Sequence, residues 1–215
     1  MFELLGNGIA ETLYMTVVST ALSYVFGLPL GVLLCVTDKN GVFRMPVFNK
    51  VLGFIINFLR SVPFLILLVA ILPFTRAIVG TTIGSTATIV PLVVAASPFI
   101  ARMVESSLKE VDSGVIEAAH SMGSSPFQII YKVLLPEAKP SLIMGAAIAI
   151  TTILGYSAMA GFVGGGGLGA IAINYGYYRY QNDVMMLTVL LLVIIVQIFQ
   201  ELGMRIAKIS DRRIK

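Results

Sequence analysis

The chain has 215 residues, of which 57% are hydrophobic and only 12% are charged, and its mean hydropathy is +0.93. A charged fraction so far below the roughly 25% of soluble domains excludes an ordinary water-soluble globular protein. The formal net charge of +4 does not indicate nucleic-acid binding, because the sequence contains no soluble basic domain to carry it.

Five apolar stretches are long enough to cross a bilayer, which takes about 20 helical residues. They cover approximately residues 13–36, 51–72, 77–100, 141–163 and 184–200. The first stretch has no basic start and is too long for a secretory signal peptide, so we expect it to remain as a helix. The pattern predicts an all-α integral membrane protein with five transmembrane helices, forming a single transmembrane domain over residues 1–215.

Basic residues are distributed unevenly between the two sides of these helices. Only Arg76 and Arg179 follow the second and fourth stretches. Twelve bases follow the first, third and fifth stretches: Lys39, Arg44, Lys50, Arg102, Lys109, Lys132, Lys139, Arg205, Lys208, Arg212, Arg213 and Lys215. Short cytoplasmic loops collect Lys and Arg, so we predict an N-terminus outside and a C-terminus inside. The tyrosine-rich segment 175–180 fits this assignment as an outer aromatic belt, with substrate gating as the alternative.

Small residues recur in two of the stretches, where they allow helix backbones to approach each other. Gly27 and Gly31 form a small-xxx-small pair in the first stretch, and glycine and alanine recur along the fourth. We therefore expect the fourth helix to be central in the bundle. Cys35, the only cysteine, lies in an apolar run and can form no internal disulfide, so redox chemistry is not indicated.

One charged residue, Arg60, interrupts the second apolar stretch shortly before Pro63. A charge at the bilayer centre costs roughly 2.5 to 3.5 kcal/mol on insertion scales, so its side chain should face protein or water. Two interpretations remain open. Arg60 is either part of a transport pathway or a structural arginine that bonds carbonyl groups at a break in the helix.

Two glycine patterns bear on nucleotide binding. Gly164, Gly166 and Gly169 are spaced as in a dinucleotide-binding loop, but no strand precedes them and no acidic residue lies about 20 positions on. We interpret this run as a broken helix terminus at the outer face. The sequence also lacks the glycine-rich loop ending in Gly-Lys-Ser or Gly-Lys-Thr that holds ATP phosphates, so a partner must bind any ATP.

The polar segment 102–139 is cytoplasmic according to the distribution of bases. It keeps apolar residues at helical spacing, which predicts short amphipathic helices rather than a loose linker. Gly123 is expected to end one short helix. Ser125, Pro126 and Gln128 then supply a cap, a first-turn proline and a capping-box partner for a second helix, which should end before Pro136.

A motif within this segment is similar to one from a known family. Glu117-Ala118-Ala119 is followed after three residues by Gly123, and after nine more by Val133-Leu134-Leu135-Pro136. This string resembles the EAA motif of binding-protein-dependent ABC importer permeases. The resemblance implies a coupling helix that docks into a groove of a separate ATPase subunit, with Glu117, Ala118, Ala119, His120, Ser121, Met122, Gly123, Ser124, Pro126, Leu135 and Pro136 as the coupling residues. His120, the only histidine, is interpreted as a surface contact, and no metal site is expected.

Further strings extend the resemblance over nearly the whole chain. They are Arg60-Ser61-Val62-Pro63-Phe64, Pro73-Phe74-Thr75-Arg76 and Gly155-Tyr156-Ser157-Ala158-Met159-Ala160-Gly161. Together they resemble the permease subunits of methionine importers in bacterial inner membranes. The resemblance implies a homodimer of this chain, two ATPase subunits that bind ATP and Mg, and a periplasmic binding lipoprotein that delivers L- or D-methionine. This chain would then be no enzyme and hold no cofactor.

The transport pathway is expected at the two-fold axis of that homodimer. Tyr156, Ser157 and Met159 interrupt the run of small residues in the fourth stretch, which, with the resemblance, favours a lining role for them. Arg60, Ser61 and Pro63 are the further pathway candidates. Packing within the core of the bundle is the alternative.

Other classes of protein fit the sequence less well. A secondary transporter usually has internal repeats, more than five helices and intramembrane acids, and the five stretches contain no acid. A membrane enzyme needs a catalytic constellation, whereas the chain has one histidine and one cysteine. A sister importer with the same machinery and another amino acid or small polar nutrient as cargo remains the alternative.

Overall fold

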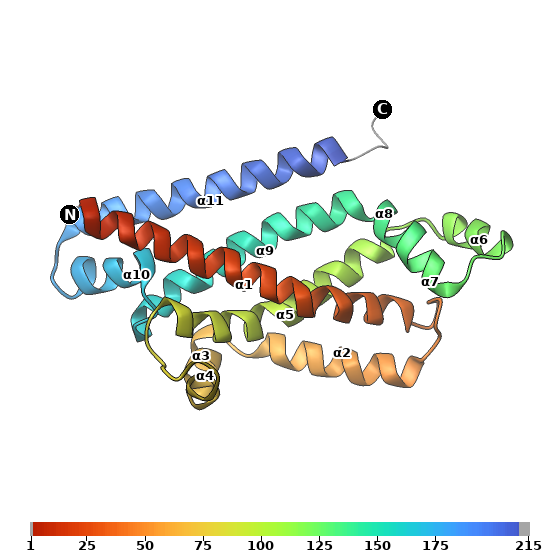
Figure 1. Cartoon of the computed structure of the whole chain (residues 1–215), viewed down its shortest axis with the longest axis horizontal. Helices are drawn as coiled ribbons and strands as arrows, with labels where there is room; N and C mark the ends of the chain where they lie inside the picture. The colour runs from red at the N-terminus through yellow and green to blue at the C-terminus, as the bar shows by residue number, and fades with distance from the viewer. Residues whose placement is uncertain (1, 211–215) are drawn as a thin grey trace.

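The computed structural model describes residues 2–210, and within this range every regular element is a helix (Figure 1). The predicted all-α fold is therefore confirmed. In chain order the α-helices are α1 (Phe2–Val36), α2 (Pro46–Ser61), α3 (Phe64–Ala70), α4 (Leu72–Val79), α5 (Ser85–Lys109), α6 (Ser113–Ser121), α7 (Pro126–Ile129), α8 (Leu135–Glu137), α9 (Lys139–Ala160), α10 (Gly167–Ile171) and α11 (Asn182–Ser210). Helical turns of other types cover Ile130–Leu134, Gly161–Val163 and Ala172–Tyr177. Three of the bases that predict orientation, Arg212, Arg213 and Lys215, lie outside the described residues.

Four helical segments within residues 2–210 are long and apolar enough to cross a membrane. They are Glu3–Val36, Ser85–Lys109, Lys139–Tyr177 and Asn182–Ser210. A fifth span is present if α2 and α3 are counted together, although these two helices are bent by 98° where they meet. The expected five-helix membrane protein is thus found as four to five candidate spans.

Two of the expected spans differ from the structure. The expected helix over 51–72 bends after α2, because Val62 is extended (φ −80°, ψ 123°) and Pro63 has no N–H to donate. The expected helix over 77–100 begins at Ser85 instead. Gly80 and Gly84 take left-handed φ angles of 82° and 98°, which separate α4 from α5. Residues 61–75 and 77–101 contain no charged side chain, so the distribution of charge alone does not reveal these breaks.

The most extensive helix packing in the molecule joins α1 to α5, which cross in the centre of the bundle (Figure 1). Gly27 and Gly31 make this close approach possible: a Cβ atom on Gly31 would lie 2.5 Å from the Ala101 carbonyl oxygen, and one on Gly27 2.7 Å from an Ile100 methyl. Ile100, Ala101 and Val104 are almost completely buried at this contact. The predicted small-residue pair is therefore a helix-packing site.

Helix α9 is the central element that sequence analysis expects, since it contacts α1, α5 and α11. Its approach to α11 is again made by small residues, because a Cβ on Gly203 would overlap the methyl group of Ala147. Helix α11 is otherwise largely exposed along its length (Figure 1). The single chain thus presents much of its apolar surface outward.

The glycine run after α9 reverses the chain at the end of the bundle where the N-terminus lies (Figure 1). Helix α9 ends at Ala160, and Gly164 has a left-handed φ of 80°, so the predicted broken terminus is confirmed. Helix α1 holds the turn in place. The Glu11 carboxylate accepts a hydrogen bond from the Gly167 N–H at 2.6 Å, and the Thr12 hydroxyl accepts one from the Leu168 N–H at 2.9 Å.

Candidate functional site

The polar segment between α5 and α9 forms the opposite end of the molecule, next to the α1–α2 connection (Figure 1). Its first helix, α6, begins at an acidic cap, because the Asp112 carboxylate accepts a hydrogen bond from the Gly114 N–H at 2.7 Å. The helix then ends in a left-handed residue. Gly123 has φ 76°, its N–H donates to the His120 carbonyl, and the next N–H, from Ser124, donates to Ala119.

The second short helix, α7, begins with the predicted capping box. The Ser125 N–H donates to the Gln128 side chain at 2.8 Å, and the Gln128 N–H donates to the Ser125 hydroxyl at 3.4 Å. Pro126 occupies the first turn, as expected. Helix α7 ends at Ile129, before Pro136 as expected. The chain nevertheless stays helical beyond it, through a π-helical turn, Ile130–Leu134, and the short helix α8, which contains Pro136.

Buried side chains fix this segment on the membrane bundle. Ala119, Ile129 and Leu134 are each at most 3% exposed and belong to the same apolar cluster as Ile100 and Val104 of α5. Leu135 packs against that cluster, while Ser124 and Pro126 are half-buried. The remaining motif residues face outward: Glu117, Ala118, His120, Ser121, Met122, Gly123 and Pro136.

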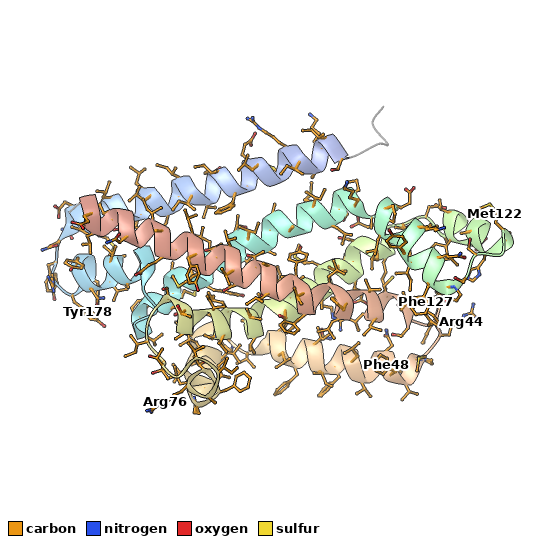
Figure 2. All side chains as sticks on the ribbon, viewed as in Figure 1. Arg44, Phe48, Arg76, Met122, Phe127 and Tyr178 are labelled. Atoms are coloured by element: carbon orange, nitrogen blue, oxygen red, sulfur yellow. The ribbon has the colours of Figure 1, made fainter. Side chains whose placement is uncertain are left out.

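Exposed apolar side chains extend this outward surface beyond the motif. Met122 is 79% exposed and Phe127 75%, and Figure 2 shows both at the same end of the molecule as Arg44. The Phe127 ring packs edge-to-face on Phe43 of the α1–α2 connection, with ring centroids 5.8 Å apart. Sequence analysis did not single out Phe43 or Phe127. The available signal was a phenylalanine directly after the first-turn Pro126, where a polar residue suits a solvated helix start.

The chemistry of this surface suits a protein contact rather than catalysis. His120 is exposed, and within residues 2–210 no three His, Cys, Asp or Glu side chains gather as they would around a metal ion. The surface instead combines small residues, one carboxylate and large apolar side chains around a rigid turn. Exposed Met and Phe side chains are typical of protein–protein interfaces.

The pathway candidates fall into two groups. Arg60 and Tyr156 line a small crevice of about 150 Å³ between α2, α5 and α9, which also includes Phe64 and Phe99. The Tyr156 ring stacks on Phe64 with centroids 4.6 Å apart and planes 7° apart. The crevice therefore connects the bend after α2 with the central helix α9.

The other pathway candidates lie outside this crevice. Ser61 and Pro63 are exposed at the bend, where the Ser61 hydroxyl donates to the Asn57 carbonyl at 2.8 Å. Ser157 is buried, and its hydroxyl donates to the Leu154 carbonyl at 2.8 Å. Met159 points outward and is 46% exposed. A single chain thus brings only Arg60 and Tyr156 together, and the lining role of all six residues remains a prediction.

Comparisons with known proteins agree with each other. The family model described as "Binding-protein-dependent transport system inner membrane component" matches residues 27–215. A probable D-methionine transport system permease protein of Vibrio cholerae is 50% identical, covering 98% of this chain and 94% of that protein. The D-methionine transport system permease protein of Escherichia coli is 53% identical over 161 residues, 75% of this chain and 74% of that protein.

Solved structures extend the agreement to the fold. A chain from inward-facing conformations of the MetNI methionine ABC transporter has a TM-score of 0.97 and 51% identity, covering 99% of this chain and 98% of that one. An amino acid ABC transporter crystallised with histidines shares the fold at 20% identity and a TM-score of 0.80. The chain belongs to the family of binding-protein-dependent transport system inner membrane components.

Proposed function

We propose that this chain is the permease subunit of an ATP-driven importer that moves methionine across the bacterial inner membrane. The observation that carries the proposal is the full-length match, at 51% identity and a TM-score of 0.97, to a chain of a methionine ABC transporter. The names of the relatives, which refer to D-methionine transport, support the same cargo. The four to five candidate spans place the chain in the membrane.

The proposed complex contains two copies of this chain and two ATPase subunits, which bind ATP and Mg. A periplasmic binding lipoprotein delivers L- or D-methionine. ATP binding and hydrolysis shift the permease between two states, one open to each side, which is alternating access. This chain performs no catalysis, and the absence of a Gly-Lys-Ser or Gly-Lys-Thr loop from its sequence supports that division of labour.

The α6–α7 segment is the proposed contact with the ATPase. Glu117, Met122 and Phe127 are all exposed on it, while Ala119 beneath them is buried on the bundle. A force that the ATPase exerts on the α6–α7 segment therefore reaches the buried core of the permease. The pathway is proposed near the crevice of Arg60 and Tyr156, with Ser61, Pro63, Ser157 and Met159 as further candidates at the two-fold axis.

A sister importer that carries another amino acid is the second candidate. The fold shared with an amino acid ABC transporter crystallised with histidines favours it, because the same architecture serves other cargo. In a hydrophobic pocket, a substrate that lacks one methylene group binds less favourably by only about 1 to 3 kcal/mol. Energy differences this small do not follow from the fold or the family, which therefore do not define the substrate. Transport must be measured to separate the two.

Transport in vesicles tests the proposed function. The chain, expressed with its neighbouring genes and purified, should bring an ATPase with it. Reconstituted with ATP inside and the binding protein outside, the complex should accumulate labelled methionine, and ADP in place of ATP should abolish uptake. Histidine uptake without methionine uptake would establish the sister importer, and purification without any ATPase would overturn both.

The second prediction concerns the orientation of the chain in the membrane, with its N-terminus outside. It rests on the twelve bases predicted on the inner side, compared with Arg76 and Arg179 on the outer side. In a Cys35→Ala background, an impermeant thiol reagent added to intact cells should label Gly6→Cys. The same reagent should label Ser210→Cys only after the cells are opened. Labelling of Ser210→Cys from outside intact cells would reverse the proposed topology.

Coupling is tested at Gly123, whose φ of 76° is unfavourable for a β-branched residue. Gly123→Val should strain the α6–α7 turn by roughly 1 to 3 kcal/mol without steric overlap, since no atom lies within 4 Å of an added Cβ. Methionine uptake should fall about tenfold or more while membrane abundance is kept.

Gly123→Asn is the matched control, because asparagine tolerates a left-handed backbone, and it should retain most of the uptake. Glu117→Lys, which reverses the exposed charge on α6, should weaken ATPase co-purification. Full uptake by both Gly123→Val and Glu117→Lys, with the ATPase still bound, would refute the coupling assignment.

The pathway assignment is tested with a cysteine at Met159, which is 46% exposed in the single chain. If two copies meet near this residue, Met159→Cys in a Cys35→Ala background should cross-link the two chains on oxidation, and ATP should change the yield. Leu154→Cys serves as the control, because the Leu154 side chain is buried and a cysteine there should stay unlinked. A Met159→Cys that is unreactive in every nucleotide state would remove Met159 from the proposed two-fold axis.

A further inference from the structure

A chain of charged groups joins three helices where α5 approaches the α6–α7 segment. The Arg102 guanidinium on α5 donates from Nη1 to the Glu105 carboxylate at 2.6 Å. The other oxygen of Glu105 accepts a hydrogen bond from Lys109 Nζ at 2.8 Å, and Lys109 Nζ also lies 2.6 Å from the Asp38 carboxylate beyond the end of α1. Glu105 is only 8% exposed. The hydrogen bond from Lys109 holds the pKa of Asp38 below its usual range, so Asp38 is ionised at neutral pH.

The same guanidinium holds α2. Arg102 Nη2 donates to the Gly53 carbonyl at 2.9 Å, and Nε donates to the Asn57 side-chain oxygen at 3.1 Å. Gly53 and Asn57 are four residues apart on α2, so one side chain spans a full helical turn of that helix. Only a planar guanidinium can reach both acceptors and a carboxylate together, because its donors lie in a fixed fork.

Helix α2 packs on α5 and touches α1, but few of its side chains are buried in these contacts. Its buried residues are Gly53 and Ile56, and Ile56 shares a small apolar cluster with Leu34 and Ala101. Asn49 adds a hydrogen bond from its side-chain amide to the Leu34 carbonyl at 2.7 Å. Most of the remaining helix surface is exposed, including Val47, Phe54 and Phe58. Arg102 is therefore a principal polar link between α2 and α5.

The position of this link matches a mechanical role. Asn57 lies about one helical turn before Arg60, which lines the crevice at the bend after α2. At the other end, Lys109 is the last residue of α5, and α6 begins at Ser113. The charged network thus lies between the surface proposed to meet the ATPase and the region proposed to line the pathway.

We propose that Arg102 is a positioning residue for transport, which fixes α2 to α5 so that displacement of the α6–α7 segment also moves α2 and the bend at Arg60. This inference rests on the proposed function. Charge-assisted hydrogen bonds that are partly buried are short and strong, and a guanidinium or carboxylate left unpaired in the membrane is costly. The link therefore keeps its geometry while the two ends of the permease move.

The test separates coupling from stability. Arg102→Lys keeps a charge for Glu105 but reaches only one acceptor at a time on α2, and Asn57→Ala removes one of those acceptors. Both variants should retain membrane abundance, ATPase co-purification and ATP hydrolysis within about twofold, while methionine taken up per ATP hydrolysed falls at least about fivefold. Arg205→Ala is the control, because Arg205 makes an exposed 2.7 Å ion pair with Glu201 on α11 and should leave the ratio unchanged.

A second variant reaches the link from the other helix. A Cβ on Gly53 would lie 3.1 Å from Arg102 Nη2, so Gly53→Val should push the guanidinium off its carbonyl partner. Gly6→Val is the matched control, since no atom lies within 4 Å of a Cβ there. If the two residues act through one contact, Gly53→Val combined with Arg102→Lys should lower the ratio no further than either single change.

The experiment distinguishes a failure of the positioning role of Arg102 from a failure of the proposed function. If the unaltered complex lacks an ATPase or takes up no methionine, the proposed function fails first. If the unaltered complex transports methionine and the variants keep its uptake-to-hydrolysis ratio, the positioning role is refuted. The positioning role is also refuted if the uptake-to-hydrolysis ratio of the double variant falls by the product of the two single losses. If Arg102→Lys does not reach the membrane, the uptake-to-hydrolysis ratios of Asn57→Ala and Gly53→Val decide whether the positioning role holds.

Discussion

The close contact between α1 and α5 is the constraint on which the rest of the fold depends. In a membrane, apolar side chains gain little free energy by leaving the lipid for a helix contact, so helices associate only where their surfaces fit closely. Gly27 and Gly31 bring the α1 backbone against Ile100, Ala101 and Val104, and a Cβ on either glycine would overlap atoms of α5. Helix α9 packs on both members of this pair, and α11 packs on α9. Helix α10 also packs on α1 and α9, whereas α3 and α4 contact this frame less extensively.

Two breaks in the helices are supported by neighbouring side chains, and one of them lies beside a candidate site. A membrane tolerates irregular backbone only where protein or water satisfies the freed polar groups. The glycine run meets this requirement through the side chains of Glu11 and Thr12, which bond the N–H groups of Gly167 and Leu168. The bend at Pro63 lies beside the crevice of Arg60 and Tyr156. These irregular points give a tightly packed bundle places where the chain can change direction or move.

Local signals could be predicted from the sequence, and long-range ones could not. The capping box at Ser125 and the left-handed Gly123 depend on neighbouring residues, and both are present in the structure. Arg60 and Pro63 indicate a break near the end of α2, but the 98° bend between α2 and α3 cannot be predicted from them. The link from Arg102 to Gly53 joins positions 49 apart in sequence, and neither residue forms a motif with its neighbours. Sequence analysis therefore predicts the proposed coupling segment but not the contacts that hold α2 to α5.

A movement is transmitted through a protein only if the surface that receives the force and the part that moves belong to one rigid body, or are joined by a stiff contact. The α6–α7 segment and the turn after it are joined to the bundle by Ala119, Ile129 and Leu134, which are buried in the same apolar cluster as Ile100 and Val104 of α5. Helix α2 packs on α5, but most of its surface is exposed and its apolar cluster with the frame is small. A stiff joint is then needed at α2. An arginine with three fixed partners supplies it at the last turns of α5, where the nearby Lys109 and Asp38 complete the charge balance that burial of Glu105 demands.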